Sequence, residues 1–203
     1  MNVYDERGKA LISAKMKVKS LNVTLPRRTL LDIIKSYVKP SSIFTGYDVT
    51  KVEQTNSKVT LHFAEQESEA FDLCLGADGL YSTVRDAVGA TSKINYNGYT
   101  CFRGMVEDVQ LKDEQVANEY WGAKGKVGIV PLINNRAYWF ITIHAKEKEP
   151  KYQTFGKPHL QAYFNHFPDE VREVLDKQSE TGILLHDIYD LKPLRTFVYG
   201  RTI

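Results

Sequence analysis

The chain has 203 residues, 42% of them hydrophobic, and a formal net charge of +2. So many apolar side chains exclude a disordered chain, and the scattered basic residues argue against a nucleic-acid-binding or anionic-membrane surface. The start "MNVYDERGKA" has no apolar signal segment, and no apolar run is long enough to span a membrane. We therefore expect a cytoplasmic protein, with Cys74 and Cys101 as reduced core thiols.

The first half of the chain predicts short strands and helices in alternation. The segment "MNVYDERGKALISAKMK" predicts a hairpin around the turn at 5–8. A helix is expected between Pro26 and Pro40, because apolar residues recur there at 3.6-residue spacing. Three strands follow, at 47–53, at 58–63 and over "AFDLCL".

The second half predicts long aromatic strands with alternating polarity. They are "YTCFRGMVED", "NEYWG", "KVGIVPL" and "AYWFITIHA", and Asn134-Asn135 favours a tight hairpin between the last two. Two helices are expected next, one with an apolar stripe from Leu160 to Phe167 and one that begins at Pro168. Closing strands are expected over "GILLHDIYDL" and "FVYGRTI". The fold class is therefore α/β with an α+β mixture, in two lobes.

The segment "LCLGADGLYSTVR" places Asp78 at the carboxyl end of a strand and just before a helix. In open α/β sheets nucleotides bind at this position, and an acidic side chain there accepts hydrogen bonds from ribose hydroxyls. Alternatively, Asp78 caps the helix while Gly76 and Gly79 form the turn. The spacing alone leaves both interpretations open.

The segment "GADGLYSTVR" resembles the Asp-Gly fingerprint of the single-component FAD-dependent aromatic monooxygenases. The residues that fit this fingerprint are Gly76, Ala77, Asp78, Gly79, Ser82 and Arg85. The segments "LPRRTLLDII", "YNGYTCFRG", "KVGIVPL" and "HDIYDL" resemble, in the same order, segments of the branch that contains urate and salicylate hydroxylase-like enzymes.

Two motifs of that family are absent from the sequence: the opening Gly-x-Gly-x-x-Gly and the later Gly-Asp-Ala-Ala-His. The resemblance therefore implies the middle portion of such an enzyme. It implies a partial FAD-binding lobe at 1–92, a substrate-domain sheet with helices at 93–195, and a strand returning to the FAD lobe at 196–203. We expect flanking segments of the same enzyme as partners, and self-association through uncovered apolar edges.

The resemblance also implies roles for individual residues. A flavin reduced by NAD(P)H would use O2 to hydroxylate a small aromatic or heteroaromatic substrate. The residues implied for FAD are Arg27, Val49, Asp78 and Gly79. Those implied for the substrate and the chemistry are Arg103, Tyr138 and Lys126. Each also has an ordinary interpretation, such as an exposed helix-end arginine for Arg27 or a core strand residue for Val49.

Two other functional classes stay open. The chain is then either a non-enzymatic truncated module or part of another flavin oxidoreductase of the same superfamily, such as a reductase or a halogenase. The five histidines show no metal-binding spacing, so no metal site is expected.

Overall fold

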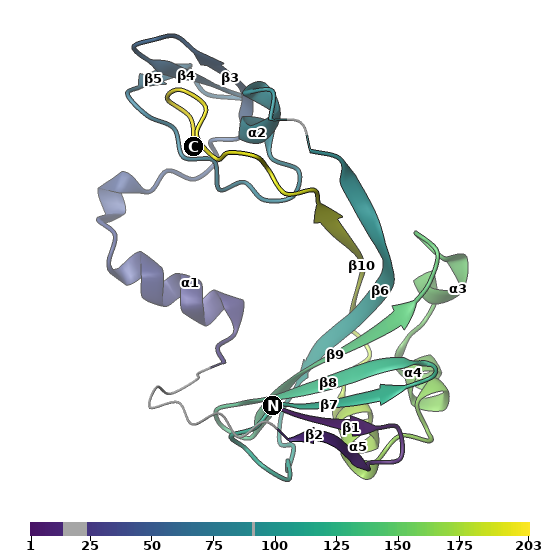
Figure 1. Cartoon of the computed structure of the whole chain (residues 1–203). Helices are drawn as coiled ribbons and strands as arrows, with labels where there is room; N and C mark the ends of the chain where they lie inside the picture. The colour runs from purple at the N-terminus through teal and green to yellow at the C-terminus, as the bar shows by residue number, and fades with distance from the viewer. Residues whose placement is uncertain (14–23, 91) are drawn as a thin grey trace. The chain divides into compact units, whose positions relative to one another are not determined.

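The computed structural model describes residues 1–13, 24–90 and 92–203 (Figure 1). The chain divides into two compact units. The first, here called the seven-stranded unit, comprises Met1–Thr29 and Tyr96–Ile188. The second, here called the Asp78 unit, comprises Leu30–Asn95 and Tyr189–Ile203. No helix within the described ranges has the length and apolar character needed to cross a bilayer.

The predicted aromatic strands form one sheet in the order β10-β6-β9-β8-β7-β1-β2. The strands are β1 (Asn2–Asp5), β2 (Ala10–Ser13), β6 (Ile94–Val106), β7 (Asn118–Gly122), β8 (Gly125–Leu132), β9 (Arg136–His144) and β10 (Leu184–Leu191). Strands β6, β9, β8 and β7 pair antiparallel, whereas β1 pairs parallel to β7. The tight hairpin between β8 and β9 is confirmed, with Asn134 and Asn135 at positive φ.

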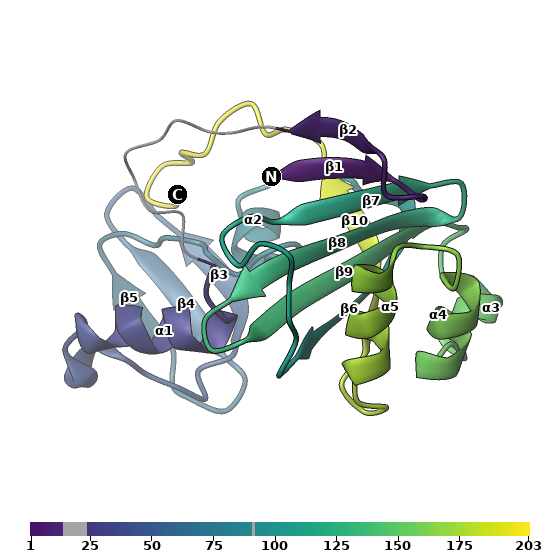
Figure 2. The ribbon, with the colours of Figure 1, turned by 90° about the horizontal axis from the view of Figure 1, so that it is seen from below.

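Three helices complete the seven-stranded unit: α3 (Pro150–Gln153), α4 (Lys157–Tyr163) and α5 (Asp169–Lys177). Figure 2 shows α4 and α5 beside the sheet. Alternate strand residues such as Phe102, Trp139 and Ile141 are fully buried and belong to the same core as Phe164 and Val171. Burial of this aromatic and aliphatic surface is the main stabilising contribution to the unit.

A buried carboxylate links α5 to β7. Glu170 is 5% exposed and accepts hydrogen bonds from the Tyr120 hydroxyl and from Asn118 Nδ2, the latter at 3.2 Å. The backbone N–H of Lys112 also donates to Glu170, at 3.4 Å. Burial and the adjacent Glu170 carboxylate raise the pKa of Tyr120, so its phenol stays protonated and donates.

The Asp78 unit is less completely packed. It contains the antiparallel sheet β3-β4-β5, with β3 (Val49–Gln54), β4 (Val59–Phe63) and β5 (Glu69–Phe71), and the short helices η1 (Pro40–Ser42) and α2 (Thr83–Ala87). Among its described residues, the buried hydrophobic cluster consists of Val52, Val59, Cys74 and Val84. The predicted helix α1 (Arg27–Ser36) is confirmed, but it crosses the boundary between the units and buries none of its residues.

Two strand predictions in this unit were wrong. The strand predicted over "AFDLCL" ends at Phe71, and further on only Cys74 forms an isolated parallel bridge, to Thr202. "FVYGRTI" forms no regular strand, because the chain reverses at Gly200, which has a φ of 64°, and pairs Tyr199 with Thr202. The expected hairpin extended to residue 17, and its part from residue 14 onward lies outside the described residues.

The compact units have different bounds from the predicted lobes. The β1–β2 hairpin belongs to the seven-stranded unit, because β1 pairs in register with β7. The predicted lobe at 1–92 instead included this hairpin. The assignment of the lobes to cofactor and substrate stays a prediction.

The Glu170 contacts predict a large loss of stability on truncation. Glu170→Ala leaves the Tyr120 hydroxyl and the Asn118 amide buried without their acceptor, so we expect a loss of about 3 kcal/mol in the free energy of unfolding. Urea unfolding followed by tryptophan fluorescence measures this change. Glu173→Ala, on the same helix, removes a half-buried carboxylate that accepts one long hydrogen bond from the Gln110 N–H, at 3.5 Å, and should cost less than about 1 kcal/mol. Equal effects of the two variants would contradict a special role for Glu170.

Candidate functional site

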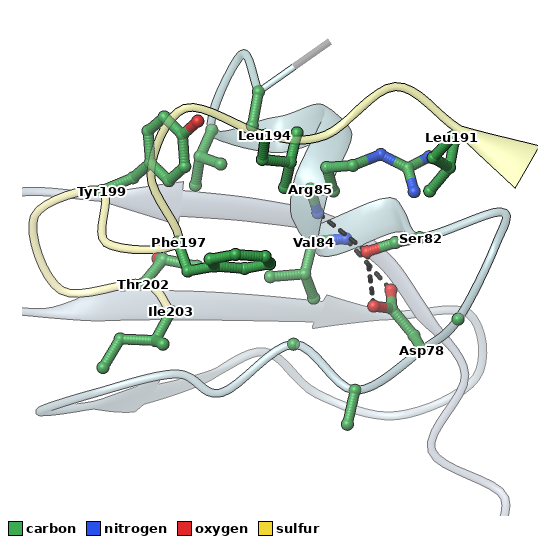
Figure 3. A pocket seen from close by; sticks show the side chains of 15 residues that line it. Asp78, Ser82, Val84, Arg85, Leu191, Leu194, Phe197, Tyr199, Thr202 and Ile203 are labelled. Atoms are coloured by element: carbon green, nitrogen blue, oxygen red, sulfur yellow. Dashed lines mark hydrogen bonds between the residues drawn. The ribbon is translucent and has the colours of Figure 1, made fainter. Parts of the chain in front are cut away.

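A cavity of about 380 Å³ lies within the Asp78 unit. One side is formed by the loop Gly76–Gly79 and helix α2, and the other by the closing segment between Leu191 and Ile203. Figure 3 shows Leu194, Phe197 and Tyr199 along this cavity, with Asp78 at its edge. Most lining side chains are apolar, and Asp78 and Arg85 are the charged residues among them.

Asp78 is held in place by the helix that follows it. Its Oδ1 accepts a hydrogen bond from Ser82 Oγ at 2.5 Å, and its Oδ2 accepts one from the backbone N–H of Val84 at 3.1 Å (Figure 3). Ser82 is the N-cap of α2, and its Oγ accepts from the N–H of Arg85 at 2.9 Å. The interpretation of Asp78 as a residue that supports the start of helix α2 is therefore confirmed.

Hydrogen bonding also controls the charge of Asp78. Burial acts to raise the pKa of this carboxyl, but the hydrogen bonds from Ser82 and Val84 outweigh it and lower the pKa below its ordinary value. Asp78 is thus ionised at neutral pH, while its side chain remains exposed. The backbone N–H groups of Asp78 itself and of Thr83 also hydrogen-bond to this carboxyl and lower its pKa further.

The glycines on either side of Asp78 have separate functions. A side chain at Gly76 would lie 2.7 Å from Val84 Cγ1, so the absence of one allows the loop to pack against α2. Gly79 has a φ of 82°, a conformation that favours glycine, and no atom within 4 Å of where its Cβ would be. The space above Gly79 is therefore open to solvent or to a ligand.

The other two residues implied for FAD lie outside the cavity lining. Arg27 is the first residue of α1 and is exposed. Val49 is the first residue of β3, where it packs against the small apolar cluster of the Asp78 unit. The surroundings of Val49 are therefore those of a strand residue in contact with the core.

The three residues implied for the substrate lie on one face of the seven-stranded sheet. Across the antiparallel ladders Arg103 pairs with Phe140, Tyr138 with Met105, and Lys126 with Thr142. Paired residues project to the same face and side chains alternate along a strand, so all three lie on the face opposite Phe102, Trp139 and Ile141. We call this the open face, because helices α3 to α5 pack against the other one.

The cationic residues of the open face differ in their surroundings. Arg103 is half-buried, and its Nε is buried without a hydrogen-bond partner among the described residues. Lys126 is exposed, and its ammonium lies 4.6 Å from the ring centre of Trp121 on the neighbouring strand. Trp121 in turn donates from Nε1 to Glu119 Oε2 at 2.8 Å.

Sequence reasoning missed Trp121 and the closing segment around Phe197. Trp121 follows Glu119 at a spacing of two in "NEYWG", so strand alternation already placed both on one face. Phe197 gave no such signal, because its approach to the Asp78 loop depends on the chain reversal at Gly200.

The Asp78 geometry predicts a pH-dependent local stability. A carboxyl whose pKa is lowered by folding stabilises the fold above its unfolded pKa, about 3.9, and loses this contribution as the pH falls through the lowered folded value. Asp78→Ala should therefore reduce the amide-exchange protection of Val88 about fivefold at pH 7, from loss of roughly 1 kcal/mol of capping. The difference should shrink below about pH 4. Asp86→Ala, on the exposed side of α2, is the control; equal protection of wild type and Asp78→Ala at pH 7 would rule out the capping function.

Two of the known proteins to which this sequence is similar are a monooxygenase and a hydroxylase. The chain is 25% identical over 206 residues to an aurachin C monooxygenase/isomerase of Stigmatella aurantiaca, covering 99% of this chain and 54% of that protein. It is 29% identical over 180 residues to an FAD-dependent urate hydroxylase of Klebsiella pneumoniae, covering 86% of this chain and 45% of that protein. No protein-family model matches the chain.

The fold is similar to that of a solved flavoprotein. The Klebsiella pneumoniae protein HpxO, crystallised with FAD and uric acid, superimposes with a TM-score of 0.78 at 21% identity, over 99% of this chain and 54% of HpxO. The chain thus spans about half the length of the relatives it matches. The resemblance read from the sequence is confirmed: the homologues and structural neighbours of this chain are FAD-dependent monooxygenases.

Proposed function

We propose that this chain forms the substrate-binding sheet and part of the cofactor lobe of an FAD-dependent monooxygenase that hydroxylates a small aromatic or heteroaromatic substrate with NAD(P)H and O2. The grouping of Arg103, Tyr138 and Lys126 on the open face of the seven-stranded sheet carries this proposal. The names of the relatives give the reaction type, because they are monooxygenases and a hydroxylase.

On the cofactor side, the residues present fit a nucleotide sugar. Asp78 is ionised, exposed and held by Ser82 and Val84, so its solvent-facing carboxylate would accept hydrogen bonds from ribose hydroxyls. Gly79 leaves the adjoining space free. Arg27 would add a cation from the start of α1, and Val49 would contribute an apolar contact through β3. When bound, the flavin would supply the oxygen-transfer chemistry.

On the substrate side, the open face offers donors and cations beside aromatic rings. The Arg103 guanidinium would bind an anionic or carbonyl oxygen of the substrate, because its buried Nε has no described protein partner. Tyr138 lies next to Phe140, with ring centres 6.2 Å apart, and would donate its hydroxyl proton at the edge of a planar ring. Lys126 would stabilise negative charge on the substrate.

The chain alone should bind FAD weakly and be inactive. It contains neither Gly-x-Gly-x-x-Gly nor Gly-Asp, the motifs that hold the pyrophosphate and the ribityl chain in the family it resembles. The Asp78 unit also exposes many large apolar side chains, including Leu73, Leu75, Phe197, Val198 and Ile203. We propose that flanking segments of the enzyme cover this surface, and that the isolated chain self-associates through it.

The test uses an enzyme in which this chain is joined to the flanking segments that its relatives carry. We expect a yellow protein that oxidises NAD(P)H faster with an aromatic substrate and yields a product with one added oxygen atom. Lys126→Gln should lower kcat/KM about tenfold through loss of a charge-assisted contact, with unchanged flavin content. Lys124→Gln, which removes a charge from a lysine whose ammonium donates to the Tyr163 carbonyl, is the matched control.

A second comparison tests the cofactor assignment. Asp78→Asn removes the carboxylate charge, whereas Ser82→Ala removes a capping hydrogen bond and retains the carboxylate. Ser82→Ala also removes the bond to Asp78 Oδ1 but keeps the charge, so we expect FAD content to fall much more in Asp78→Asn than in Ser82→Ala. Equal flavin occupancy in wild type and Asp78→Asn would contradict the cofactor function. A flavin-loaded enzyme that releases no hydroxylated product would favour another oxidoreductase class.

A further inference from the structure

A second hollow lies in the seven-stranded unit, where the turn between β1 and β2 meets the end of the β7–β8 hairpin. Its volume is about 550 Å³. The residues that line it are Asp5, Glu6, Arg7, Trp121, Gly122, Ala123 and Lys126. Two carboxylates and two cations therefore lie in one small region. Which ligand fits there depends on which of these four groups is not already hydrogen-bonded to the protein.

Both carboxylates are already bonded to the protein. Asp5 Oδ1 accepts the backbone N–H groups of Arg7 and Lys9, at 2.9 and 2.8 Å, and so closes the turn. Glu6 Oε2 accepts the backbone N–H of Ala123 at 3.0 Å and lies 3.6 Å from His166 Nε2. The Glu6–Ala123 bond joins the two turns, and together these bonds occupy carboxylate lone pairs that an external cation would need.

The two cations have no such partner. Within the described part of the chain, the Arg7 guanidinium makes no hydrogen bond or ion pair, and Lys126 contacts only the ring of Trp121. The indole is 39% exposed, and its N–H is bonded to Glu119. The available donors of this hollow are thus those of Arg7 and Lys126, both of which carry positive charge.

We propose that this hollow binds a small oxyanion, a carboxylate or a phosphate group, between Arg7 and Lys126. The guanidinium fork suits two oxygens of such a group, and the ammonium provides a point charge that the Trp121 ring holds in place. The site shares Lys126 with the substrate residues of the proposed function, but it adds Arg7 and requires neither flavin nor the Asp78 unit, so anion binding is measured separately from turnover. A carboxylated substrate and a phosphorylated coenzyme are both sources of this chemistry.

The test titrates the ¹⁵N-labelled full chain with benzoate and, separately, with inorganic phosphate, at constant ionic strength in chloride. The chain has two tryptophans, so the indole N–H of Trp121 reports on the hollow while that of Trp139, buried on the opposite face, serves as the internal reference. We expect the Trp121 signal to shift in a saturable manner and the Trp139 signal to stay unchanged. Preference for benzoate or for phosphate identifies the source, and either result supports the site.

Matched variants locate the anion. Arg7→Gln and Lys126→Gln should each weaken binding about fivefold, the effect expected for one exposed ion pair. Lys9→Gln and Lys124→Gln remove the same charge from neighbouring positions outside the lining and should leave the dissociation constant unchanged. All four side chains are exposed, so the fold should persist, and an unchanged Trp139 signal checks it. Absence of a saturable Trp121 shift, or equal weakening in all four variants, would overturn the proposal.

Discussion

Burial of alternate side chains against the helices determines the arrangement of the seven-stranded unit. Phe102, Trp139 and Ile141 are fully buried in the core that α4 and α5 complete. Because a strand alternates with a period of two, burial of these residues directs Arg103 and Tyr138 to the opposite face. A shift of one residue in the ladder would bury the charged residue and expose the tryptophan, so the packing energy of the core also fixes the position of the polar groups.

The Asp78 loop shows that a carboxylate that supports a helix start can still be exposed to solvent. The bonds from Ser82 and from backbone N–H groups, among them that of Val84, keep the group ionised. These bonds also restrict the rotamers of Asp78. A ligand that bound the carboxylate in this orientation would therefore cost little further side-chain entropy of Asp78. The sequence left open whether Asp78 caps the helix or contacts a cofactor. In this geometry the first function does not exclude the second.

The sequence predicted those features that depend on local periodicity. The aromatic strands, the Asn134-Asn135 hairpin and helix α5 follow from alternation, turn residues and an apolar stripe, and all are present. The failures depend on long-range pairing. Nothing in "FVYGRTI" indicates that Thr202 meets Cys74 in an isolated bridge, and the pairing of β1 with β7 joins segments more than 100 residues apart. Likewise, no local pattern indicates that Arg7 and Lys126 line one hollow, because this depends on the meeting of two turns far apart in the chain.

The two units differ in how much of their apolar surface they bury. The seven-stranded unit encloses its core with its own helices. The Asp78 unit buries four residues in its cluster and exposes Leu75 and Phe197 at 68% and 69%. Exposed apolar surface marks a site of association, so in the proposed enzyme the Asp78 unit would depend on further polypeptide more than the seven-stranded unit would. Substrate contacts on the sheet would accordingly be the part of the proposed mechanism that this chain makes by itself.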